Sequence, residues 1–153
     1  MFGVDKGGNA SFALGAGDCD GYRWAVRATS GWAGATALAY ALAYHAFGPV
    51  FIALMTDQPA LRDVAANYLP WVVAMPLVAV WSYQLDGIFI GSLRTREMRD
   101  GMVIAFAAFL AAAFALPAAW DNHGLWAALA VFFVMRALTL LVYLSRHPPR
   151  FAG

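Results

Sequence analysis

The stretch from Val64 to Leu93 reads VAANYLPWVVAMPLVAVWSYQLDGIFIGSL, and its only charged residue is Asp86. A helix that crosses a bilayer needs about 20 mostly apolar residues, so this stretch predicts a membrane-spanning helix. The whole chain of 153 residues is 62% hydrophobic and 12% charged, whereas a soluble domain is about 45–50% apolar and about 25% charged. Sequence and composition together predict an all-α membrane protein.

Three other stretches are similarly apolar, and one of them contains Arg136. We predict four spans, at about residues 28–55, 66–93, 100–120 and 124–145, within a transmembrane region that covers 28–146. Residues 1–27 are rich in glycine and charged residues and are predicted to form a cytoplasmic N-terminal loop segment. Residues 147–153 are predicted to form a cytoplasmic tail. His123, between the last two spans, is expected to be an ordinary surface residue.

The basic residues outside these spans gather on one side of the predicted membrane. Four spans place eight of them on one face and only Arg62 on the other. The eight are Lys6, Arg23, Arg27, Arg94, Arg96, Arg99, Arg146 and Arg150. Because positively charged loops stay in the cytoplasm, the bias predicts that both termini are cytoplasmic.

Two opposite charges lie inside the predicted spans. Asp86 is seven residues from Leu93, and Arg136 is nine residues before Ser145. At 1.5 Å per residue, they lie roughly 10 Å and 13 Å from the cytoplasmic ends of two parallel helices. An isolated charge in hydrocarbon is costly. We therefore expect Asp86 and Arg136 to form a charge pair or to line one wet pocket, and Asp86 to be a candidate for ion coupling.

A purely structural arrangement of these charges is an open alternative. Arg136 would then snorkel to the headgroups, and Asp86 would bond to Arg94 or Arg96. Further polar residues are candidates for a cavity: Ser82, Tyr83 and Gln84 close to Asp86, and Tyr40, Tyr44 and His45 in the first span. Gly87 and Gly91 have the small-xxx-small spacing that allows close helix packing.

Several classes of protein are excluded by the same sequence. The formal net charge is only +1 without a basic stripe, which argues against a nucleic-acid partner. The single cysteine, Cys19, excludes a multi-cysteine metal cluster. No phosphate-binding loop, nucleophile elbow or zinc-protease motif is present. We therefore expect neither an enzyme nor a bound metal or cofactor, beyond H⁺ or Na⁺ as a coupling ion.

Four motifs in sequence order resemble the multidrug and toxic compound extrusion (MATE) family in its DinF-like branch. They are LGAGD at 14–18, NYLPW at 67–71, DGIFIGSLRTREMR at 86–99 and NHGLW at 122–126. The resemblance covers about residues 12–146 and implies four helices of the second lobe of a twelve-helix bacterial inner-membrane antiporter. Such transporters export cationic or amphipathic drug-like compounds in exchange for H⁺ or Na⁺. Asp86 resembles the acidic residue that some branches place in the cation site.

The resemblance also implies that the N-terminal lobe is missing, so we expect this chain alone to be inactive. Two alternatives stay open. The chain is either a small self-contained four-span transporter that works as a dimer, or a non-transporting scaffold subunit. The first predicts efflux by this chain alone, whereas the second predicts that Asp86 and Arg136 serve packing only.

Overall fold

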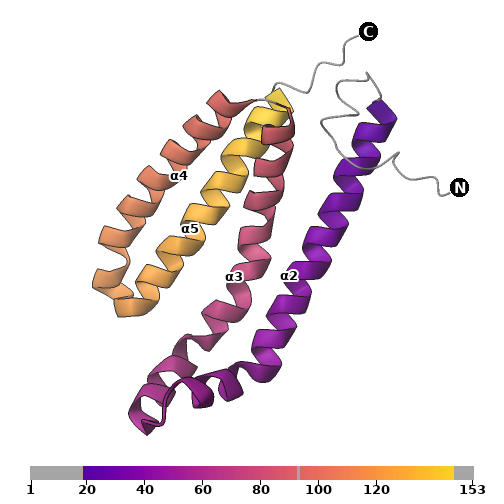
Figure 1. Ribbon diagram of the computed structural model, residues 1–153. Coiled ribbons are helices and arrows are strands. Elements are labelled where there is room, and N and C mark those ends of the chain that lie inside the picture. Colours follow the sequence, from indigo (N-terminus) through magenta and orange to yellow (C-terminus); the bar gives the residue numbers. More distant parts are fainter. Residues whose placement is uncertain (1–18, 93, 147–153) are drawn as a thin grey trace, which may run out of the picture.

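A computed structural model describes residues 19–92 and 94–146 of the chain, which form four helices (Figure 1). The helices are α2 (Cys19–Met55), α3 (Pro59–Gly91), α4 (Thr95–Ala115) and α5 (Pro117–Arg146). Each is long and apolar enough to cross a membrane. The prediction of an all-α membrane protein with four spans is therefore confirmed.

The helices extend beyond the predicted spans. Residues 19–27 belong to α2, so the prediction of a loop is wrong for this part of the chain. Tyr22 and Ala25 are buried there, which stabilises the helix beyond its uncharged stretch. α3 likewise begins at Pro59 rather than near residue 66. The predicted loop over 1–18 and the predicted tail over 147–153 lie outside the described residues.

The α4–α5 connection is a sharp reversal that lies earlier in the sequence than predicted. α4 ends at Ala115, and the backbone departs from helical geometry at Trp120 and Asp121. Asp121 has a φ of 47° and a ψ of −134°, a backbone conformation that residues other than glycine rarely adopt. Gly124 is buried, and a Cβ built on it would lie 2.4 Å from the carbonyl carbon of Leu116. The reversal therefore requires a glycine at this position.

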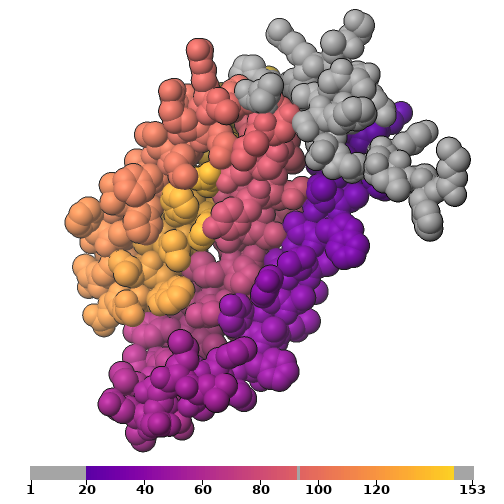
Figure 2. All heavy atoms as spheres, viewed as in Figure 1, coloured from indigo at the N-terminus to yellow at the C-terminus, as the bar shows by residue number. Residues whose placement is uncertain are grey.

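The four helices form an open row in the order α2, α3, α5, α4 (Figure 1). Among the described residues, α2 packs on α3 alone, whereas α3 also packs on α5 and α4, and α4 packs on α5. Figure 2 shows α2 along one edge of the row and α4 along the other. α3 and α5 run in the same direction, so they can bring residues of equal depth together.

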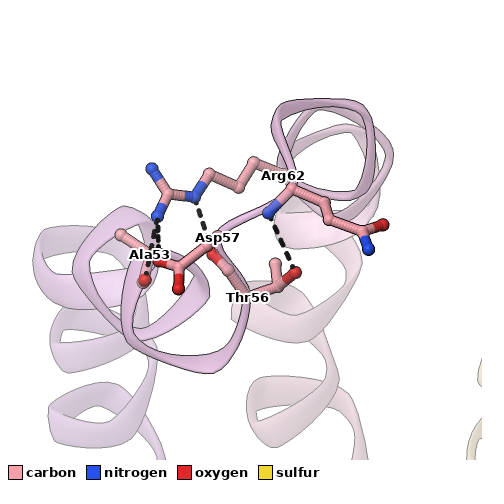
Figure 3. Close-up of polar contacts among 5 residues, drawn as sticks. Ala53, Thr56, Asp57 and Arg62 are labelled. Carbon is pink, nitrogen blue, oxygen red and sulfur yellow. Dashed lines mark hydrogen bonds and ion pairs between the residues drawn. The ribbon is translucent and has the colours of Figure 1, made fainter.

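The α2–α3 connection is held by one arginine (Figure 3). Arg62 donates from Nε to the Thr56 carbonyl at 2.8 Å and from Nη2 to the Ala53 carbonyl at 3.1 Å. Its Nη2 also lies 3.4 Å from Asp57 Oδ1. A cation that binds the last carbonyls of a helix stabilises its C-terminus. The guanidinium of Arg62 thus caps α2 and ties it to the start of α3.

Candidate functional site

A buried ion pair joins α3 to α5. Arg136 Nη2 lies 2.8 Å from Asp86 Oδ2, and Arg136 Nε donates to both carboxylate oxygens at 3.1 Å and 3.2 Å. Asp86 is 8% exposed and Arg136 is 6% exposed. The two-point contact fixes the orientation of the guanidinium as well as its distance. The structure thus brings together the two residues that the sequence placed at similar depth.

Other arginine contacts decide against the alternative arrangement of these charges. Arg94 pairs with Glu97 at 3.1 Å, and its guanidinium carbon lies 4.9 Å from the centre of the Phe89 ring. Arg136 contacts Asp86 rather than snorkelling past it. Asp86 is therefore bound by Arg136 of α5, not by Arg94 at the end of its own helix.

The surroundings of the pair supply only weak further bonds. Arg136 Nη1 contacts the thioether sulfur of Met102 on α4, and a thioether is a weak acceptor. Ser82 lies one helical turn before Asp86 and is fully buried. Its hydroxyl has no hydrogen-bond partner among the described residues. The site therefore contains one charged pair and one buried hydroxyl that is free to bind.

The other polar residues near Asp86 point elsewhere. Gln84 Nε2 donates to Thr29 Oγ1 at 2.9 Å and to Ser30 Oγ at 3.2 Å, so Gln84 contacts α2. Tyr83 is 63% exposed, and its ring packs against Phe133. Of the three predicted neighbours, only Ser82 shares the buried face of Asp86. Successive residues on a helix point about 100° apart, which separates the three side chains.

The polar residues of the first span lie outside the site. Tyr40 is 57% exposed, Tyr44 is 37% exposed and His45 is exposed. α2 buries small residues instead, with Ala37 and Ala41 at 3% and 4% exposure. Small side chains allow a close approach between helices. Tyr40, Tyr44 and His45 are therefore exposed on the outer side of α2, away from the ion pair, and their part in a polar cavity stays a prediction.

Gly87 does not serve close packing within this structure. It is exposed, and a Cβ built on it would meet nothing within 4 Å, while Gly91 is partly exposed. The close approaches lie at Gly48, Gly101 and Gly124. At Gly101, a Cβ would lie 3.2 Å from Thr139 Oγ1. A glycine spacing alone could not distinguish the packed glycines from the open ones.

A second polar contact between α3 and α5 was missed by the sequence interpretation. Trp71 Nε1 donates to His123 Nδ1 at 3.0 Å, and the Tyr68 and His123 rings lie 4.8 Å apart between centres. His123 is therefore bound to α3, although it is exposed. Tyr68 and Trp71, one helical turn apart on either side of Pro70 at the start of the predicted span, were the available signal.

A pocket of about 250 Å³ lies between α4 and α5. Its lining is apolar and comes from Phe109, Leu125, Trp126 and Leu129. Arg136 is seven residues beyond Leu129, or about 10 Å along α5. The pocket is therefore separate from the ion pair. Among the described residues, no group of three or more His, Cys, Asp or Glu side chains is placed to hold a metal ion.

Comparisons with known proteins place these observations in a family. A family model described as MatE matches residues 8–117. The chain is 38% identical over 149 residues to the DNA damage-inducible protein F of Escherichia coli (strain K12). That match covers 84% of this chain and 32% of the relative, so the chain spans about a third of the relative's length. No solved structure matches the chain.

Proposed function

This chain belongs to the MATE family of membrane transporters, and from that premise we propose that it forms part of one lobe of a multidrug efflux antiporter. Members of the family are transporters and not enzymes. The four apolar helices make the chain an integral membrane protein that contacts the lipid bilayer. The proposed activity is export of cationic or amphipathic compounds in exchange for H⁺ or Na⁺ across a bacterial inner membrane.

The observation that carries this proposal is the buried pair of Asp86 and Arg136. A carboxylate in hydrocarbon is costly unless it is paired, protonated or bound to a cation. H⁺ or Na⁺ would therefore compete with Arg136 for Asp86. When H⁺ or Na⁺ replaces Arg136 at Asp86, the ion pair between α3 and α5 is lost. Ion binding would therefore change the packing of these two helices directly.

Ser82 supports an ion-binding role for the same place. Its free hydroxyl lies one turn from the carboxylate of Asp86 on the buried face of α3. Hard cations bind carboxylate and other oxygen ligands. If the ion pair served packing alone, the unpartnered hydroxyl of Ser82 would only destabilise the protein, because a buried polar group without a partner is unfavourable.

The exposed face of α2 supports the need for further helices. Tyr40, Tyr44 and His45 turn away from α3 although they lie in an apolar span. Polar side chains in a membrane normally face protein or a wet cavity rather than lipid. We propose that the rest of the transporter covers this face and that the 153 residues alone do not transport.

An efflux assay in a pump-deficient bacterium tests the proposal. One strain expresses this chain alone, and another expresses the Escherichia coli relative with its matching third replaced by this chain. We expect dye efflux from the chimera only. In the chimera, Asp86→Asn should weaken the dependence on the ion gradient, whereas Asp57→Asn, at an exposed pair, should not.

Two results would count against it. Energy-dependent efflux by the chain alone would favour a small dimeric transporter. If efflux by the Asp86→Asn chimera depended on the ion gradient as strongly as efflux by the unmodified chimera, Asp86 and Arg136 would serve packing only.

The orientation is a separate part of the proposal, supported by the basic residues at one end of the helices. Single cysteines at Ser92 and Asn122, introduced into a Cys19→Ser background, should react with a membrane-impermeant reagent from opposite sides. Ser92 should be cytoplasmic. Reaction of both cysteines from the same side would contradict four spans with cytoplasmic termini.

A further inference from the structure

We infer that His123 holds α5 against α3 only while its imidazole is neutral, so that binding of a proton to His123 releases this contact. The contact consists of the hydrogen bond from Trp71 Nε1 to His123 Nδ1, at 3.0 Å, and the packing of the Tyr68 ring at 4.8 Å. This inference does not rest on the proposed efflux function, because it involves only α3 and α5.

The chemistry of the two rings fixes the protonation state of the contact. The indole N–H of Trp71 can only donate a hydrogen bond, so His123 Nδ1 must accept it. The neutral imidazole then carries its proton on Nε2. A proton added to Nδ1 would turn the acceptor into a donor that faces another donor. Protonation of His123 therefore breaks the contact.

The position of His123 adds to this effect. His123 follows Asp121, the last residue with non-helical backbone angles, by two residues. It therefore lies in the first turn of the regular part of α5, where the free backbone N–H groups carry partial positive charge. The neutral ring is compatible with both the indole donor and the helix terminus.

Among the described residues, no carboxylate forms an ion pair with His123. α3 faces His123 with Tyr68 and Trp71, both uncharged aromatic residues. The end of α4 approaches the same turn with the Leu116 backbone. The nearest charged side chain on α5 is that of Asp121, which is exposed and forms no ion pair with His123. Asp121 cannot restore an acceptor at His123 Nδ1.

The contact lies far from the ion pair on the same two helices. Trp71 is 15 residues before Asp86, and His123 is 13 residues before Arg136. These separations correspond to about 20 Å along the helices. Acidification would thus release α5 from α3 at the end near Trp71 while Asp86 and Arg136 keep the other end joined.

Tryptophan fluorescence of the full chain in lipid nanodiscs between pH 5 and 8 tests the inference, because loss of the hydrogen bond to His123 changes the environment of the Trp71 indole. We expect a single step in the wild type that is lost in Trp71→Phe. The step should also be lost in His123→Gln, whose side chain still offers an acceptor but does not titrate. His45→Gln is the matched control, since His45 is exposed on α2, and it should keep the full step.

A distance measurement keeps the inference testable if one variant folds poorly. Spin labels at Val64 on α3 and Leu125 on α5, both about half exposed, report the separation of the two helices at this end. In a Cys19→Ser background, the distance should increase at pH 5 relative to pH 8, and His123→Gln should abolish the increase. Equal increases with and without His123, or no change in either protein, would overturn the inference.

Discussion

α3 is joined to its two main neighbours by different chemistry. Its contact with α5 contains a buried ion pair and an indole–imidazole hydrogen bond. Its contact with α2 uses small residues, such as Ala37 and Ala41, and the neutral hydrogen bonds of Gln84. Apolar packing gains little in lipid, because lipid tails are as apolar as the side chains. The contrast indicates that polar contacts specify the α3–α5 pairing, whereas close backbone approach specifies the α2–α3 pairing.

Removal of one charge should break the α3–α5 contact most severely. Asp86→Asn leaves Arg136 buried without a counter-charge and should lower the free energy of unfolding by about 3–5 kcal/mol. Unfolding in mixed detergent micelles measures the change. Asp57→Asn, at a fully exposed carboxylate, is the control and should cost less than about 1 kcal/mol. Equal losses in the two variants would contradict the contrast.

The α4–α5 reversal supports the α3–α5 contact by fixing where α5 begins. Gly124→Ala places a methyl group against the Leu116 backbone and should cost about 1–3 kcal/mol. Gly87→Ala is the matched control. Its new methyl group meets open space, so it should be neutral or stabilise the helix by up to about 1 kcal/mol. The same unfolding assay compares them, and a tolerated alanine at position 124 would argue against the close approach.

Loss of the α2 cap should loosen the other side of α3 to a smaller extent. Arg62→Ala removes the hydrogen bonds to the carbonyls of Ala53 in α2 and of Thr56 directly after it, and it should cost about 1 kcal/mol. Hydrogen exchange of the amides near Met55 should increase locally. Arg96→Ala removes an exposed arginine that forms no ion pair among the described residues, and it should leave exchange there unchanged. Equal exchange in both variants would exclude the capping role.

The smallest expected effect concerns the hydrogen bonds between α2 and α3. Gln84→Leu keeps the side-chain volume and removes the bonds to Thr29 and Ser30, so it should cost about 0.6 kcal/mol. Tyr83→Phe, at the neighbouring exposed position, should have no measurable effect. A loss as large as that of Asp86→Asn would remove the distinction between the two contacts.

Much of the fold could be predicted from the sequence because the membrane imposes simple rules. Apolar stretches of sufficient length identified the four helices, and equal depth on parallel helices identified Asp86 and Arg136 as neighbours. The prediction of a loop over residues 19–27 was wrong because a search for uncharged stretches finds only the part of a helix that crosses the hydrocarbon. The helical turns beyond it, stabilised by Tyr22 and Ala25, carry charges.

The faces of the helices could not be predicted in the same way. In a soluble helix, apolar periodicity marks the buried side, but a membrane helix is apolar around its whole circumference. The sequence therefore could not tell that Ser82 is buried on the same helix face as Asp86 while Gln84 contacts α2. It also could not separate Gly124, which a neighbouring backbone approaches, from Gly87, which is open. His123 was missed because its partner, Trp71, is 52 residues away.

The central claim is that Asp86 and Arg136 stabilise the α3–α5 contact as a pair, and a double-mutant cycle tests it most directly. The cycle compares the free energy of unfolding of Asp86→Asn, Arg136→Gln and the double variant in the same detergent. The structure predicts that the double variant recovers part of the stability that either single variant loses, because neither charge is then left alone. Losses that add to within about 0.5 kcal/mol would show that the two side chains act independently and would contradict the claim.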